Sequence, residues 1–98
     1  MRLIWSTPSI TDLLAIDEWL THYAGQRTSE NNLDRIRKKA RQLRDFPGSG
    51  PDVHNGLRSV GVLTTNYILI YRIIDRGVEI VRIRHNRENW RDDMDEVD

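Results

Sequence analysis

The sequence contains no cysteine, and its three histidines lie far apart in the chain. Without cysteine the chain forms no disulfide, offers no thiolate to a metal and has no cysteine nucleophile, which suits a reducing compartment. His22, His54 and His85 show no spacing that is typical of metal ligands. We therefore expect no structural metal and no cofactor.

Long hydrophobic runs are missing as well. The longest apolar stretch, residues 68–71, is far shorter than the roughly 20 residues of a membrane-spanning helix. The opening residues 1–5 lack the apolar core of a signal peptide. These absences predict a cytoplasmic protein with no membrane partner. A length of 98 residues allows one domain around one hydrophobic core.

Positive charge is absent from the C-terminal end of the chain. Fifteen basic and fifteen acidic residues give a net charge of zero, but residues 92–98 hold five acids and no base. Residues 1–91 thus carry all fifteen bases against ten acids. We expect a mildly basic domain at 1–91 and a solvated acidic tail at 92–98. Bases cluster at 35–44 and 82–91, where they can meet phosphates or an acidic protein surface, or simply face solvent.

Two helices are predicted in the first half of the chain, after a short strand at residues 2–6. Thr7 or Ser9 can cap the first helix, which ends near Gly25. Thr28 or Ser29 can cap the second, which runs to about residue 45. Apolar residues at helical spacing predict the core stripe of each helix: Ile10, Leu13, Ile16, Leu20 and Tyr23 in the first, and Leu33, Ile36, Ala40 and Leu43 in the second.

Residues rich in proline and glycine at 46–51 separate the helices from three strand-like runs at 57–63, 67–74 and 78–85. The last two runs are joined by a short loop in which Gly77 can supply a positive φ. Alternation predicts Val81 and Ile83 on one face of the last strand and Arg82 and Arg84 on the other. The predicted fold class is α+β, in the order β-α-α-β-β-β, with a helical hairpin packed on a mostly antiparallel sheet.

Particular segments accompany this element order: Thr7–Leu13, which contains an Asp-Leu pair early in the first helix, Leu43–Gly50, Gly56–Val60, Tyr67–Arg72 and Val81–Trp90. In sequence and in order they resemble the RelE/ParE toxin superfamily of bacterial toxin–antitoxin pairs. The resemblance covers nearly the whole chain. It implies the same α+β fold and a toxin that a cognate antitoxin neutralises.

The resemblance favours the ParE branch of the superfamily. The resemblance implies that ribosome-dependent RNases of the other branch have a Tyr-Arg pair at the position where this chain has Tyr67-Ile68. The arginine of that pair helps to stabilise charge on the scissile phosphate. Ile68 cannot do that, and acidic residues 92–98 would repel RNA phosphates. ParE toxins bind DNA gyrase and block its cycle. We therefore expect a type II toxin that inhibits gyrase by binding and performs no catalysis.

The expected target-binding surface lies near the last strand and comprises Arg82, Arg84, His85, Arg87 and Trp90. The alternative for these residues is that the arginines solvate one face of the sheet and Trp90 packs against the core. A second functional hypothesis is a translation-dependent mRNA endonuclease, with His85 as acid or base and Arg58, Arg72 and Arg87 as phosphate binders. A third is a family member that binds its partner but has lost toxicity.

The resemblance also implies a partner, an antitoxin of ribbon-helix-helix type whose C-terminal arm orders on the toxin. The candidates for its contact surface are Trp5, Trp19, Val62 and Leu63. Tryptophans also fill the edges of small cores, so Trp19 has that second interpretation. We expect no sequence-specific binding of nucleic acid by the toxin alone.

Overall fold

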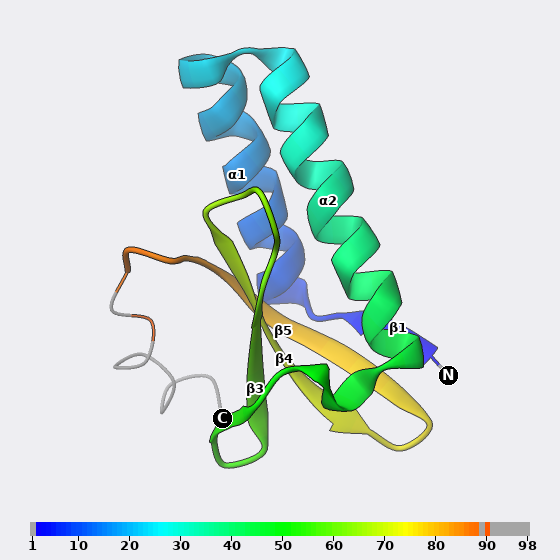
Figure 1. Cartoon of the computed structure of the whole chain (residues 1–98). Helices are drawn as coiled ribbons and strands as arrows, with labels where there is room; N and C mark the ends of the chain where they lie inside the picture. The colour runs from blue at the N-terminus through cyan, green and yellow to red at the C-terminus, as the bar shows by residue number, and fades with distance from the viewer. Residues whose placement is uncertain (1, 89, 91–98) are drawn as a thin grey trace.

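Two antiparallel helices lie on one face of a five-stranded sheet (Figure 1). The computed structural model describes residues 2–88 and 90. The predicted tail at 92–98 lies outside the described residues. The elements in chain order are β1 (Arg2–Trp5), α1 (Thr7–Ala24), α2 (Gln26–Asp45), a 3-10 turn η1 (Pro47–Ser49), β2 (Asp52–His54), β3 (Leu57–Gly61), β4 (Tyr67–Ile74) and β5 (Gly77–His85). The predicted α+β fold is confirmed, with one strand more than the sequence indicated.

The sheet has the order β1-β5-β4-β3-β2. β1 runs parallel to β5, with residues 2–5 opposite residues 77–80, and the other neighbours are antiparallel. The additional strand, β2, pairs with β3 across a tight turn at Asn55 and Gly56, which both have positive φ. Asn-Gly is a strong hairpin signal, so this strand was recognisable in the sequence.

The β4–β5 turn differs from the prediction in one detail. Arg76, not Gly77, takes the positive φ of 57°. Gly77 is buried in β5, where an added Cβ would come within 2.5 Å of the backbone oxygen of Arg2. Its lack of a side chain therefore lets β1 approach β5. Close packing of the two strands, and not a positive φ, is the reason for a glycine at this position.

Helix α1 is capped by Ser6, so the predicted caps Thr7 and Ser9 are wrong. The Ser6 hydroxyl accepts a hydrogen bond from the Ser9 backbone N–H at 3.1 Å and donates to the Val81 backbone oxygen at 2.7 Å. Of the three neighbouring hydroxyl residues Ser6, Thr7 and Ser9, the one that caps the helix is thus the one that also bonds to β5. The predicted core stripe is only partly right, because Ile10 and Tyr23 are exposed whereas Leu20 is buried and Leu13 and Ile16 pack against the core. The end of the helix hairpin projects beyond the sheet (Figure 1), so Tyr23 has no sheet to cover.

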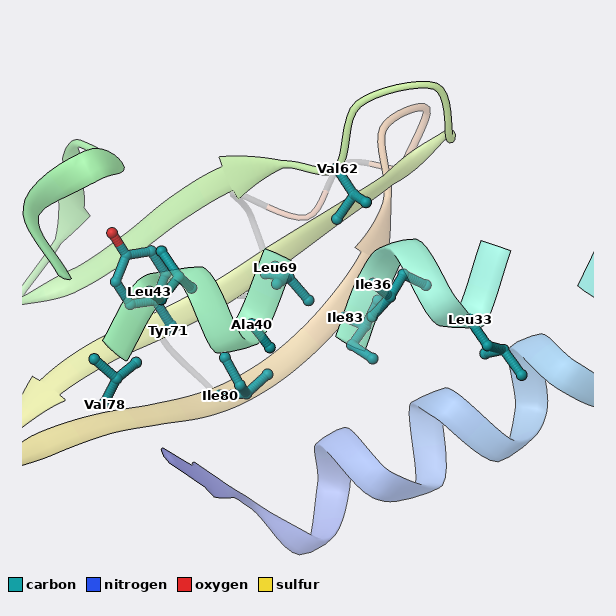
Figure 2. Packing of buried hydrophobic residues seen from close by; sticks show 10 residues of the cluster. All are labelled: Leu33, Ile36, Ala40, Leu43, Val62, Leu69, Tyr71, Val78, Ile80 and Ile83. Carbon is teal, nitrogen blue, oxygen red and sulfur yellow. The ribbon is translucent and has the colours of Figure 1, made fainter. Parts of the chain in front are cut away.

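Helix α2 begins at Gln26 after Gly25, so its predicted caps Thr28 and Ser29 are also wrong. Ser29 is fully buried inside the helix, and its hydroxyl donates to Asp17 Oδ1 of α1 at 2.6 Å. This bond ties the two helices together. The predicted core stripe of α2 is confirmed, because all four residues are buried in one cluster with residues of the sheet (Figure 2). Their partners in this cluster are Val62, Leu69, Tyr71, Val78, Ile80 and Ile83.

A bulge interrupts β5. Ile70 of β4 lies opposite Arg82 and Tyr71 lies opposite Ile80, which leaves Val81 as an extra residue in β5. Ile83 consequently packs in the cluster under the helices, whereas Val81 packs on the opposite face of the sheet with Leu57, Ile70 and Trp90. The prediction that Val81 and Ile83 share a face is wrong, because one inserted residue reverses the alternation.

Candidate functional site

The end of β5 is held by a carboxylate from α1. Asp12 Oδ2 accepts hydrogen bonds from Arg82 Nε at 2.8 Å and from the Ile83 backbone N–H at 2.9 Å, and Oδ1 accepts from Arg82 Nη2 at 2.9 Å. β1 ends before this point, so the Ser6 hydroxyl and the Asp12 carboxylate take the hydrogen-bonding positions that a longer strand would occupy. Arg82 of the predicted target surface is therefore engaged with the fold, and its side chain is only 27% exposed.

A small polar cluster follows at the tip of β5. The His85 ring meets the Tyr67 ring edge-on, with centroids 5.6 Å apart. His85 Nδ1 accepts from the Arg87 backbone N–H at 3.1 Å, and the His85 backbone N–H donates to Glu88 Oε1 at 2.9 Å. Burial, and then the nearby charge of Glu88, raise the pKa of Tyr67 above its ordinary value of 10.0. Tyr67 is thus held as a neutral phenol beside the histidine.

The other members of the predicted target surface are unequally accessible. Arg87 is exposed and Arg84 is half-buried, opposite Ile68 on the sheet face away from the helices. Trp90 is 6% exposed and belongs to the cluster with Leu57, Ile70 and Val81, so it has the packing role that was the alternative. Of the predicted set, Arg84, His85 and Arg87 are left to present an accessible surface.

The four candidate residues of a nuclease do not come together. Arg58 donates to the Gly50 backbone oxygen at 2.7 Å, and Arg72 Nε donates to Glu79 Oε1 at 2.7 Å. His85 lies opposite Tyr67, and Tyr67 is five residues along β4 from Arg72. Five strand residues span about 17 Å, so Arg72 and His85 lie at opposite ends of the sheet. Arg58 lies opposite Tyr71, four residues along β4 from Tyr67, and its side chain turns to Gly50, so neither arginine lies beside His85.

The four candidate antitoxin contacts lie on three different surfaces. Trp5 lines a groove of about 740 Å³ between β1, the start of α1 and the end of α2. Trp19 is 57% exposed on α1, with its ring centroid 4.9 Å from that of Tyr23. Val62 is buried in the core, and Leu63 beside it is 84% exposed in the β3–β4 loop. Trp19 is thus exposed and does not fill the core edge.

A metal site or a membrane span would need features that the described residues do not supply. Among residues 2–88 and 90, no three His, Cys, Asp or Glu side chains are grouped as metal ligands would be. Within the same residues, no helix is long and apolar enough to cross a membrane.

Comparison with known families decides the assignment of the chain. A family model described as the ParE toxin of the type II toxin–antitoxin system parDE matches residues 3–90. The chain belongs to the ParE toxin family. It is therefore the toxin of a type II toxin–antitoxin system, and such a toxin implies an antitoxin partner.

Individual relatives carry both names of the superfamily. Toxin RelE2 of Caulobacter vibrioides is 29% identical to this ParE-family toxin over 84 residues, which cover 86% of this chain and 93% of the relative. A chain of the chromosomal ParDE system from P. aeruginosa has the same fold, with a TM-score of 0.78 and 22% identity. That alignment covers 87% of this toxin and 95% of the other chain.

Asp12 is the residue that sequence reasoning missed in this ParE-family toxin. The sequence placed it early in the first helix and indicated no partner for it. An Asp-Leu pair at Asp12 and Leu13 was part of the resemblance, and that pair was the available signal. Because Asp12 and Arg82 are 70 residues apart, only the fold reveals that they form one unit.

Proposed function

We propose that this ParE-family toxin inhibits DNA gyrase by binding it in the cytoplasm, without cleaving a substrate of its own. The observation that supports this mode of action is the separation of Arg58 and Arg72 from His85. Each of these arginines is already bonded to a neighbour in the fold. Catalysis of phosphate cleavage needs charged donors preorganised around one phosphate, and this arrangement lacks that convergence.

The proposed contact surface is the tip of β5, with Arg84, His85 and Arg87. The arginines supply positive charge for an acidic surface on gyrase, and the backbone bond from Arg87 to His85 Nδ1 fixes the ring. Asp12 positions this tip from α1, because its carboxylate bonds to the Arg82 guanidinium and to the Ile83 backbone N–H. In this proposal they act as positioning residues and do not contact the target.

A supercoiling assay with purified gyrase tests the proposal. The wild-type toxin is expected to inhibit supercoiling, and the variant in which Arg84→Glu and Arg87→Glu are combined should need about tenfold more protein for the same inhibition. Arg76→Glu combined with Arg27→Glu is the matched control, because both side chains are exposed away from this tip and the pair changes the net charge equally. Normal supercoiling at a large excess of wild-type toxin would refute gyrase inhibition.

A second candidate function is ribosome-dependent mRNA cleavage. It is favoured by the similarity to a relative named Toxin RelE2 and by the presence of a histidine beside Arg87 and Tyr67. Ribosome profiling after induction distinguishes the two. Cleavage at a defined position within translated codons, lost in His85→Ala, would support the nuclease, whereas uncut messages with inhibited supercoiling would support gyrase binding.

We further propose that an antitoxin of ribbon-helix-helix type neutralises the toxin and contacts Trp19 and Leu63, which are exposed apolar side chains. Exposed tryptophans are common anchors of interfaces. Trp19→Ala should weaken antitoxin binding by at least about tenfold and change the free energy of unfolding by less than about 0.5 kcal/mol. A large loss of stability with unchanged affinity would contradict this role.

A further inference from the structure

Helix α2 carries bases on two flanks. Residues 35–44 contain six bases and no acid. Three of the bases lie toward β1: Arg37, Arg41 and Arg44. The other three lie toward the loop between β3 and β4 and form what we call the loop flank: Arg35, Lys38 and Lys39. The target surface proposed at the tip of β5 includes none of the loop-flank bases, so their charge has no role in the contacts with gyrase.

A groove of about 200 Å³ separates the loop flank from the β3–β4 loop. Gln42 continues the row on α2, and Thr64 lines the groove from the loop. Thr64 has a φ of 63°, which β-branched residues rarely adopt. The Thr65 N–H and hydroxyl hold this turn by donating to the Val62 backbone oxygen at 3.1 and 2.8 Å. Strained residues persist where the fold fixes them, and they cluster at binding sites.

The bases of the loop flank are not neutralised by the part of the chain that the structure describes. No ion pair of these residues includes Arg35, Lys38 or Lys39. Arg35 and Lys38 are exposed, and Lys39 is half-buried. The loop at residues 62–66 has no charged residue. The groove thus has one positively charged wall and one uncharged wall, and such a surface attracts an anionic ligand.

We propose that the loop flank binds the phosphate backbone of duplex DNA without reading its sequence. The inference rests on the proposed function in one respect, because gyrase acts on duplex DNA and a toxin bound to gyrase lies close to this ligand. The row from Arg35 to Gln42 rises about 10 Å along α2. Duplex DNA carries one negative charge per about 1.7 Å of its axis, so several phosphates lie within reach of the row.

The composition of the groove favours a phosphate backbone over other anionic partners. Two of the three bases are lysines, which bind phosphates as point charges, whereas bidentate pairing with a carboxylate needs arginine. Gln42 and Thr64 add neutral donors of the kind that contact phosphate oxygens. Single-stranded RNA is bound by stacking its bases on aromatic side chains, and none of the described residues that line this groove is aromatic.

Fluorescence anisotropy of the full chain with a labelled duplex of about 20 base pairs tests the proposal in the absence of gyrase. Binding should be weak, with a Kd of about 10–100 µM at low salt. Three phosphate contacts should raise the Kd about sixfold for each doubling of the salt concentration. Two duplexes of unrelated sequence should bind equally, within about twofold, because phosphate contacts carry no sequence information.

Two triple variants of α2 locate the binding surface. The first combines Arg35→Gln, Lys38→Gln and Lys39→Gln and should weaken DNA binding at least about tenfold. The matched control removes the same charge from the flank beside β1, with Arg37→Gln, Arg41→Gln and Arg44→Gln, and should weaken it less than about threefold. Lys38→Gln alone should lower the salt effect to about 3.5-fold per doubling. Thermal unfolding confirms that each variant is folded.

Several results would overturn the proposal. Equal losses in the two triple variants would show that only net charge matters, and a Kd that does not change with salt would exclude phosphate contacts. Tighter binding of single-stranded RNA of the same length, or of polyglutamate of equal charge, would replace DNA by RNA or by an acidic protein. Binding that appears only after deletion of residues 92–98 would mean that the chain's own acids occupy the flank.

The outcomes for DNA binding and for gyrase inhibition are separable. If the duplex binds as described while gyrase supercoils normally, the DNA-binding surface stands and gyrase inhibition fails. If supercoiling is inhibited but the duplex does not bind, gyrase inhibition stands and the DNA-binding surface is overturned.

Discussion

Replacing Asp12 with alanine should destabilise the toxin more than any other change of a single charged residue described above. Asp12 is 13% exposed and accepts three hydrogen bonds, two from the Arg82 guanidinium and one from the Ile83 backbone. Breaking a fully buried pair by removing one partner costs about 3–5 kcal/mol, and the 27% exposure of Arg82 reduces this to about 3 kcal/mol. For a domain of this size, that loss lowers the melting temperature by about 12 °C.

Calorimetry and denaturant titration measure the effect, and three variants define its origin. Asp12→Asn keeps one acceptor oxygen and should cost about half as much. Combining Asp12→Ala with Arg82→Met should be less damaging than Asp12→Ala alone, because no guanidinium then remains beside the lost carboxylate. Glu79→Gln is the control: it breaks the more exposed pair with Arg72 and should cost less than about 1 kcal/mol. An Asp12→Ala cost as small as that of the control would refute the reasoning.

Two predictions concern the tyrosines of β4. Tyr71 is fully buried, and its hydroxyl bonds to two backbone groups of residues 47–50, so Tyr71→Phe should lower the free energy of unfolding by about 2 kcal/mol in denaturant titration. Tyr23→Phe, at an exposed site, should lower it by less than about 0.5 kcal/mol. Equal losses in the two variants would contradict this prediction. Tyr67 should ionise above pH 10.0, its ordinary value, in a spectrophotometric titration, and Glu88→Gln should lower that pKa. Because folding raises this pKa, the stability gained from neutral Tyr67 is complete below pH 10.0 and is lost as the pH rises through the folded value; a midpoint at or below 10.0 would contradict this.

The sequence predicted best what depends on local periodicity. The core face of α2 followed from apolar residues three and four apart, because that helix packs along the sheet for much of its length. The same periodicity failed at the end of α1, since it cannot tell whether a helix extends beyond the sheet that it covers. Tyr23 is exposed for that reason.

Long-range contacts decided what the sequence could not. Ser6 caps α1 in preference to Thr7 or Ser9 because its hydroxyl also bonds to the carbonyl of Val81 in β5. The bulge at Val81 reversed the faces predicted for β5. The candidate target surface stays a prediction, and two of its members could not be judged from the sequence, because burial of Trp90 and the bond from Asp12 to Arg82 depend on residues far apart in the chain. No local pattern records such pairings.

The parallel pairing of β1 with β5 has a consequence for the order of synthesis. The helix hairpin has its internal contacts, including the bond from Ser29 to Asp17, once residue 45 is made. β1 has no strand partner until residues 77–80 exist, and Asp12 has none of its three donors before residue 82. Contacts of such large sequence separation form late in folding. During most of its synthesis the nascent chain thus has a first strand without its strand partner. The tip of β5 assembles only when the polypeptide is nearly complete.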